Sequence, residues 1–135
     1  MNYWLMKTEP DVFSWDDLVK KGPSMWDGVR NYAARNNLRS MKKGDNVLIY
    51  HSNIGKEIVG ISEVTREHFP DPTINDERWL AVEVKAVKKI PEPVGLAVIK
   101  ATKSLQKLQL VTHSRLSVMP VSDEHFKLIC EMGGL

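Results

Sequence analysis

The run Val47-Leu48-Ile49-Tyr50 is a continuous apolar segment that follows the turn residues Gly44-Asp45 and precedes Ser52. A short apolar run between turn signals is typical of a strand that is buried on both faces. In residues 80–86 every second side chain is apolar and two of those between are charged, which predicts a strand with one exposed face. The two segments therefore predict strands of one sheet.

Shorter segments around these two complete the predicted set of elements. Further strands are expected at residues 3–7, 58–66 and 116–121. Helical segments are expected at residues 14–21, 31–41, 96–108 and 122–132, and proline-containing connectors at 70–76 and 90–95. Gly60 inside a strand marks a bulge or a close approach of another group.

The start and end of the first helix are the most clearly signalled. Ser14 is expected to be its N-cap, with Asp17 completing a capping box and Phe13 packing on Leu18. Gly22-Pro23 then stops the helix. Ser122 is expected to cap the closing helix in the same way.

Short strands with small helices between them, and no regular β-α-β units, predict an α+β fold. The expected architecture is a strongly curved, mostly antiparallel sheet or partly open barrel with peripheral helices. At 135 residues the chain is expected to form one domain, residues 1–135.

Composition is that of a globular protein, with 42% hydrophobic and 27% charged residues and a net charge of +2. This charge is too small for a general nucleic-acid coat, although a local basic face remains compatible with it. No run approaches the roughly 18 apolar residues of a membrane span. Residues 1–20 carry charges instead of the apolar run of a signal peptide, and Cys130 is the single cysteine. We therefore expect a cytoplasmic or nuclear protein without a membrane partner, with a monomer favoured.

The segment Trp26-Asp27-Gly28-Val29-Arg30-Asn31-Tyr32 follows neither a strand nor a helix period. Its two aromatic rings offer flat faces, and its charged and amide groups offer directed donors and acceptors. Flat faces beside directed polar groups suit a planar, polar ligand such as a nucleobase. The alternative is a capped turn in which Trp26 anchors the core.

Patterns for catalysis, metals and cofactors are weak. Asp27, His51 and Ser52 invite a triad, but adjacent residues of an extended segment point to opposite sides, and Ser52 lacks a nucleophile elbow. The histidines are scattered, at positions 51, 68, 113 and 125. No dinucleotide or phosphate-cradling glycine motif occurs. We expect no enzyme and no metal or organic cofactor, and we expect Cys130 to pack in the core.

Several ordered motifs together resemble one known family. They are residues 3–10, 26–37, 44–45, 50–53, 59–61, 70–72, 115–118 and 120–121. In this order they resemble the EVE domain family, over nearly the whole chain. The resemblance implies a PUA-like curved pseudo-barrel related to YTH and ASCH domains. It also implies a non-catalytic binding module for a modified base of DNA or RNA, flipped into a pocket at the barrel mouth.

The candidate base-binding residues are Lys7, Glu9, Trp26, Arg30, Asn31, Tyr32, Ser52, Trp79, Arg115 and Ser117. Trp26 is either a stacking platform or a core anchor. Arg30 and Asn31 either contact the ligand or cap the turn internally. We expect Trp26, Arg30, Asn31 and Ser52 to line one pocket; Tyr32 is expected mainly to pack.

Two other function classes remain open at this level. One is an RNA-binding module that recognises structure instead of a modification. The other is a small-molecule sensor or nucleotide-processing enzyme using the same pocket, because one fold hosts many chemistries.

Overall fold

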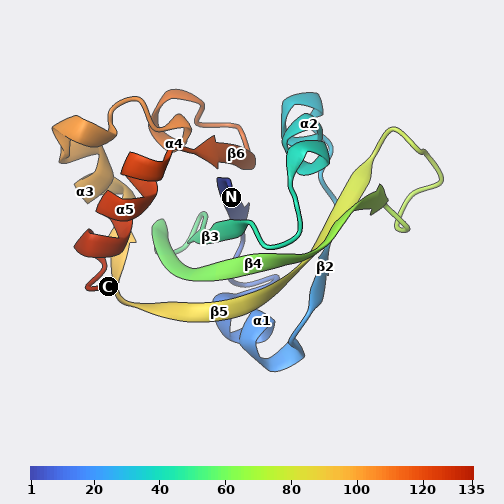
Figure 1. Ribbon diagram of the computed structural model, residues 1–135, viewed down its shortest axis with the longest axis horizontal. Coiled ribbons are helices and arrows are strands. Elements are labelled where there is room, and N and C mark those ends of the chain that lie inside the picture. The colour runs from blue at the N-terminus through green and yellow to red at the C-terminus, as the bar shows by residue number, and fades with distance from the viewer.

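The computed structural model describes residues 1–135 and contains one six-stranded sheet with short helices around it (Figure 1). The strands are β1 (Tyr3–Thr8), β2 (Ser24–Trp26), β3 (Asn46–His51), β4 (Glu57–Pro70), β5 (Leu80–Gly95) and β6 (Val118–Val121). The helices are α1 (Trp15–Lys21), α2 (Tyr32–Ser40), α3 (Leu96–Ala101), the 3-10 helix η1 (Lys103–Leu105), α4 (Gln109–Thr112) and α5 (Asp123–Met132).

The strand order is β2-β5-β4-β3-β1-β6, and every neighbouring pair is antiparallel except β1 and β3. Figure 1 shows β4 and β5 as long curved strands, with α3, α4 and α5 gathered at one end of the molecule. The sheet does not close, because β2 and β6 are its edges. The predicted α+β fold with a curved, mostly antiparallel sheet and peripheral helices is confirmed.

Strand β5 is longer than predicted, and the expected connector at 90–95 is wrong. Ile58 pairs with Val94 whereas Gly60 pairs with Lys89, so residues 90–93 have no partner on β4. Two of these residues are prolines, which cannot donate to a ladder and are tolerated at such irregular places. The prolines therefore bend β5 without ending it.

Strand β4 also extends past its predicted end at residue 66. Phe69 pairs with Ala81 and Pro70 with Leu80, so the predicted end of the strand at residue 66 is wrong and the loop begins after Pro70. The ring of Phe69 lies 4.0 Å from the Arg66 guanidinium carbon, which gives this exposed end of the strand a cation–π contact.

Helix boundaries follow the capping signals. Ser14 and Asp17 form the predicted capping box of α1, and Gly22 ends the helix at a φ of 74°. Ser122 caps α5, as predicted. No helix is long and apolar enough to cross a bilayer.

Gly60 lies directly under α1, and that contact fixes α1 on the sheet. A Cβ at Gly60 would lie 2.5 Å from carbons of the Trp15 ring, which is buried in the core. The close approach predicted from a glycine inside this strand is thus a contact with an indole ring.

We expect Gly60→Ala to lower the free energy of unfolding by about 1–3 kcal/mol, because the methyl group forces the Trp15 ring to move. Gly95→Ala is the matched control, since a Cβ there meets nothing within 4 Å and the backbone φ is −75°. Urea unfolding of both variants measures the difference. Equal stabilities would contradict the Trp15 contact as the reason for this glycine.

Candidate functional site

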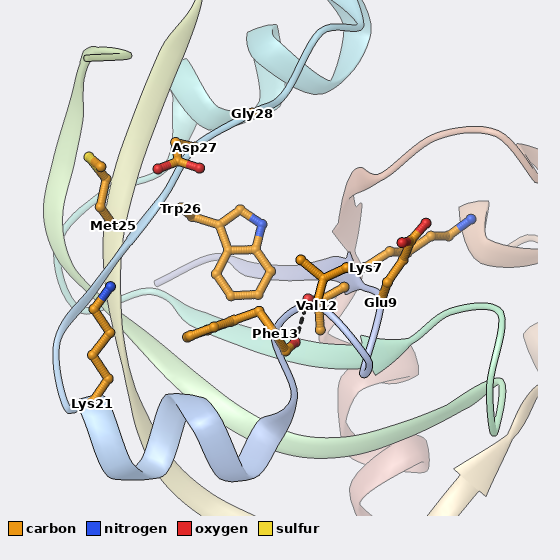
Figure 2. Close-up of a pocket in the computed structure, with 10 residues that line it drawn as sticks. Lys7, Glu9, Val12, Phe13, Lys21, Met25, Trp26, Asp27 and Gly28 are labelled. Carbon is orange, nitrogen blue, oxygen red and sulfur yellow. Dashed lines mark hydrogen bonds between the residues drawn. The ribbon is translucent and has the colours of Figure 1, made fainter. Parts of the chain in front are cut away.

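A cavity of about 520 Å³ lies between the end of β1 and the end of β2 (Figure 2). Its size lies within the range of small-ligand pockets. Its lining comes from the segment after β1, the end of α1 and the segment around Trp26; the residues are Lys7, Thr8, Glu9, Val12, Phe13, Lys21, Met25, Trp26, Asp27 and Gly28. We call it the Trp26 cavity.

Trp26 belongs both to the core and to the cavity. It is 8% exposed, is the last residue of β2 and pairs with Val82 of β5. Its ring meets Phe13 edge-on at a centroid distance of 6.0 Å, and Figure 2 shows it between Phe13 and Asp27. The indole N–H makes no hydrogen bond within the chain, and it is accessible to solvent. Trp26 is therefore a core anchor that also forms a wall of the cavity, and stacking on a base stays a prediction.

Charged groups surround this aromatic wall. The side chains of Glu9, Asp27 and Lys21 are exposed at the cavity, and the Lys21 amine lies 6.0 Å from the centroid of the Phe13 ring. Carboxylates accept hydrogen bonds from exocyclic amines of bases, and lysines donate to carbonyls. The cavity thus combines a flat apolar wall with acceptors and donors at its rim.

The turn after β3 stabilises the cavity wall at Thr8 and Glu9 through hydrogen bonds. The Ser52 amide donates to the Thr8 carbonyl at 2.8 Å, and the Ser52 hydroxyl donates to the same oxygen at 3.3 Å. The Asn53 amide group donates to Oε1 of Glu9 at 3.0 Å. Ser52 therefore supports the Trp26 cavity without lining it.

The predicted residues are divided among neighbouring cavities. Ser52 lines a second cavity of about 190 Å³, which shares Lys7 with the first. Asn31 and Arg115 line a third, shallower hollow of about 320 Å³. The expectation that Trp26, Arg30, Asn31 and Ser52 line one pocket is therefore wrong.

Four other predicted residues line none of these three cavities. Ser117 contributes its carbonyl to the Lys7 amide at 2.9 Å and so positions β1. Tyr32 and Trp79 pack their rings 5.0 Å apart, and the Arg35 guanidinium lies 5.1 Å from the Tyr32 ring. Tyr32 and Trp79 thus contact each other at the surface, where Tyr32 is 51% exposed. The remaining residue is Arg30.

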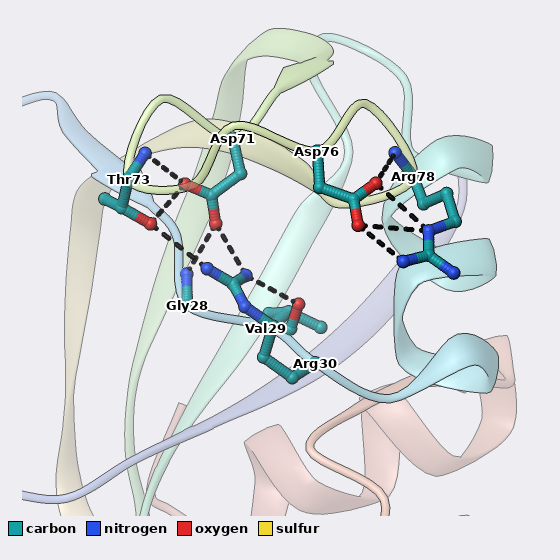
Figure 3. Close-up of polar contacts among 7 residues, drawn as sticks. All are labelled: Gly28, Val29, Arg30, Asp71, Thr73, Asp76 and Arg78. Atoms are coloured by element: carbon teal, nitrogen blue, oxygen red, sulfur yellow. Dashed lines mark hydrogen bonds and ion pairs between the residues drawn. The ribbon is translucent and has the colours of Figure 1, made fainter.

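Arg30 is held by a buried carboxylate that the sequence did not single out as functional (Figure 3). The Asp71 side chain is completely buried and accepts from the Gly28 amide at 2.9 Å, from Arg30 at 2.9 Å and from the Thr73 amide and hydroxyl at 2.8 and 2.6 Å. Gly28 lines the Trp26 cavity at a φ of 79°. Asp71 therefore fixes the cavity wall from the β4–β5 loop.

Arg30 and Asn31 make hydrogen bonds within the chain, as in the predicted alternative in which they cap the turn internally. Arg30 also donates to the Val29 carbonyl at 3.0 Å, and the Asn31 side chain caps α2 by accepting from the Ala34 amide at 3.0 Å. Polar groups that looked available in the sequence are thus largely used by the fold. Asp71 itself carried one signal, a carboxylate between two prolines followed by Thr73, which suits a locally hydrogen-bonded turn.

The ionisation of Asp71 follows from these contacts. Burial opposes the charged form, but the hydrogen bonds from Thr73, Arg30 and Gly28 outweigh it and lower the pKa of Asp71 to about 2. The carboxylate is therefore charged throughout the neutral and mildly acidic range.

The histidines and the cysteine do not gather into a metal site. His51 accepts a hydrogen bond from the Trp15 amide through Nε2 at 3.0 Å, and burial lowers the pKa of this histidine despite nearby Glu57 and Asp16. No three histidine, cysteine or carboxylate side chains are arranged to hold a metal ion. Cys130 packs against the core, and burial raises the pKa of its thiol.

We expect Asp71→Asn to lower the free energy of unfolding by about 1–3 kcal/mol, because an amide cannot satisfy the same set of donors. Asp76→Asn is the matched control: Asp76 pairs with Arg78 two residues away, at the surface, and its loss should leave stability almost unchanged. Chemical unfolding at pH 7 compares them. A similar loss in both would contradict the role of the buried carboxylate.

The same carboxylate predicts an acid dependence. Because its pKa is lower in the folded chain, its contribution of about 2 kcal/mol is complete above the ordinary aspartate value and is lost as the pH falls from about 4 to about 2. The stability difference between wild type and Asp71→Asn should therefore shrink over this interval. Unfolding curves at intervals between pH 7 and pH 2 measure it, and a constant difference would refute it.

Both the sequence and the fold of this chain match those of known proteins. Residues 2–132 match the family model described as EVE domain. Thymocyte nuclear protein 1 of Mus musculus is 36% identical over 97% of this chain and 73% of its own length. The crystal structure of protein Atu2648 from Agrobacterium tumefaciens is 48% identical, with a TM-score of 0.98 over 100% of this chain and 94% of that one.

Two structures with a similar fold contain nucleic acid. Human THYN1, in complex with DNA containing 5-methylcytosine, is 31% identical, with a TM-score of 0.92 and coverage of 100% and 99% of the two chains. A YTH domain of Zygosaccharomyces rouxii, in complex with N6-methyladenosine RNA, has a TM-score of 0.61 at 14% identity over 98% and 86%, which shows a shared PUA-like fold alone. With the family model covering residues 2–132, this chain belongs to the EVE domain family.

Proposed function

We propose that this chain is a non-catalytic reader of a modified base in DNA or RNA, and that the base enters the Trp26 cavity. The observation that carries the proposal is the cavity of about 520 Å³ in which the Trp26 and Phe13 rings stand beside the Glu9 and Asp27 carboxylates. The human relative in complex with 5-methylcytosine DNA supports it, since it shares the fold over the full chain.

The cavity suits a base taken out of its stack. A flipped base stacked on an aromatic side chain gains about 1–3 kcal/mol, which helps to offset the cost of unstacking. Glu9 and Asp27 would accept from an exocyclic amine, while Lys21 and the free Trp26 N–H would donate. A modification that adds a small apolar group would be accommodated against Val12 and the rings.

The predicted site residues take distinct roles in this proposal. Trp26 and Glu9 contact the base, and Lys7 lies at the edge of the cavity, where the backbone of the nucleic-acid strand would pass. Ser52, Ser117 and Arg30 position the walls through the hydrogen bonds described above. Asn31 and Arg115 line a hollow that is available to flanking nucleotides. Residues 1–135 act as one domain, and the cytoplasm or nucleus is the expected location.

We expect Val12→Trp to weaken binding of the preferred oligonucleotide at least tenfold, because the larger side chain fills the cavity. Val12 is 75% exposed, so the change leaves the core intact. Val87→Trp is the matched control, being 54% exposed on β5 and lining none of the three cavities described above. Fluorescence anisotropy measures affinity for single-stranded DNA and RNA of one sequence carrying 5-methylcytosine, N6-methyladenine or no modification.

Two results would contradict the proposal. Equal affinity of the wild type for all modified and unmodified strands would favour recognition of structure instead of a base. Tight binding of the free modified nucleoside, with no gain from the surrounding strand, would favour the small-molecule alternative.

A further inference from the structure

The second cavity, of about 190 Å³, has a strongly basic lining that base recognition does not explain. Three lysines line it: Lys7 from β1, Lys56 from the turn before β4 and Lys100 from α3. None of its lining residues is acidic, and none of the three lysines forms a salt bridge. We call it the three-lysine cavity.

The strand register brings two of its polar groups together. Lys7 and Tyr50 are direct partners in the parallel pairing of β1 and β3, so their side chains lie on the same face of the sheet. Lys7 is half-buried, and its amine donates to the Ser114 carbonyl at 2.8 Å. Figure 2 shows this side chain running away from the Trp26 ring. Two of the three ammonium hydrogens of Lys7 therefore remain for another acceptor.

Tyr50 supplies an independent sign of a ligand. It is only 3% exposed, yet its hydroxyl makes no hydrogen bond within the chain. A buried tyrosine hydroxyl ordinarily has a partner. Since this oxygen is not sealed from solvent and Tyr50 lines the cavity, the hydroxyl opens into it. Burial raises the pKa of Tyr50, which keeps the hydroxyl protonated as a donor.

Four lining side chains that carry donors, with no acidic lining residue, favour a compact anion with several acceptor oxygens as the ligand. Lys7, Lys56, Lys100 and Tyr50 are all donors, and a phosphate group offers unshared oxygens to such a set. A base or a sugar would leave the positive charge of the lysines unbalanced. A phosphate neutralises it.

We propose that the three-lysine cavity binds a phosphate of the same strand whose base occupies the Trp26 cavity. This inference rests on the proposed function, because Lys7 lines both cavities and so places the two subsites side by side. The phosphate sets the position of the strand and carries no base information. Affinity from this subsite is therefore common to all sequences and sensitive to salt.

The test compares two double variants that remove the same charge. Lys56→Gln with Lys100→Gln should weaken binding of every oligonucleotide roughly tenfold and reduce the slope of log affinity against log salt by about 0.7, the value for one phosphate on a single strand. Lys43→Gln with Lys127→Gln is the control, because both lysines are exposed and line none of the three cavities described above. Equal slopes in the two double variants would overturn the subsite.

Tyr50→Phe separates a ligand contact from packing. It removes only a hydroxyl without a partner in the chain, so thermal stability should stay the same while affinity falls severalfold for modified and unmodified strands alike. Unchanged affinity would remove Tyr50 from the site.

A titration with inorganic phosphate makes the subsite testable without any base. Amide resonances of Ser52, Asn53 and Lys56 should shift saturably with sodium phosphate, but not with sodium chloride at equal ionic strength, and the shifts should vanish in the Lys56/Lys100 variant. Their absence in the wild type would overturn the proposal. Phosphate binding together with equal affinity for all bases would instead refute base reading and leave the subsite standing. If the wild type discriminates between bases but the Lys56/Lys100 variant keeps the salt slope of the wild type, base reading stands and the phosphate subsite is refuted.

Discussion

The Asp71 carboxylate joins the β4–β5 loop to the segment that follows β2, and the course of the chain through the site depends on it. Its oxygens accept from a backbone amide, a guanidinium and a neighbouring threonine, so that a fully buried charge has no unsatisfied partner. Gly28 keeps its left-handed backbone because its amide is held at this point. Trp26 precedes it and α2 follows, so one buried charge aligns both the cavity wall and the start of a helix.

The parallel pair β1–β3 provides the other half of the arrangement. In an otherwise antiparallel sheet, this pair sends two chain segments out at the same edge, where Thr8 receives hydrogen bonds from Ser52 and Glu9 from Asn53. Side chains 43 residues apart, such as Lys7 and Tyr50, become neighbours through the register alone. Both cavities open where these two strands end.

Local signals in the sequence predicted local structure well. The Ser14 capping box, the Ser122 cap and the buried run at 47–50 all correspond to observed elements, because each depends on residues a few positions apart. The prolines near residues 70 and 91 misled the prediction, since their cost depends on which ladder positions lack a partner, and pairing is a long-range property.

The candidate site was predicted only in part for the same reason. Trp26 was predicted to be either a stacking platform or a core anchor, and it lies in the core while also lining a cavity. Arg30 and Asn31 looked like ligand contacts because their partners, Asp71 and the α2 backbone, are invisible to composition. Lys56 carried no signal, and Lys100 was only one of several lysines that could form a basic face; the fold alone brings both next to Lys7.

The division of the Trp26 cavity into a buried wall and an exposed rim bears on how binding preference can change. If the base enters this cavity as proposed, substitution of Trp26 disturbs packing and recognition at once, so few replacements leave a folded chain with a new preference. Val12, Lys21, Met25 and Asp27 line the same cavity and are exposed. Changes there alter shape and charge at little cost in stability. Substitutions at these exposed positions, engineered or natural, would therefore change which base the proposed site accepts while the aromatic wall stays the same.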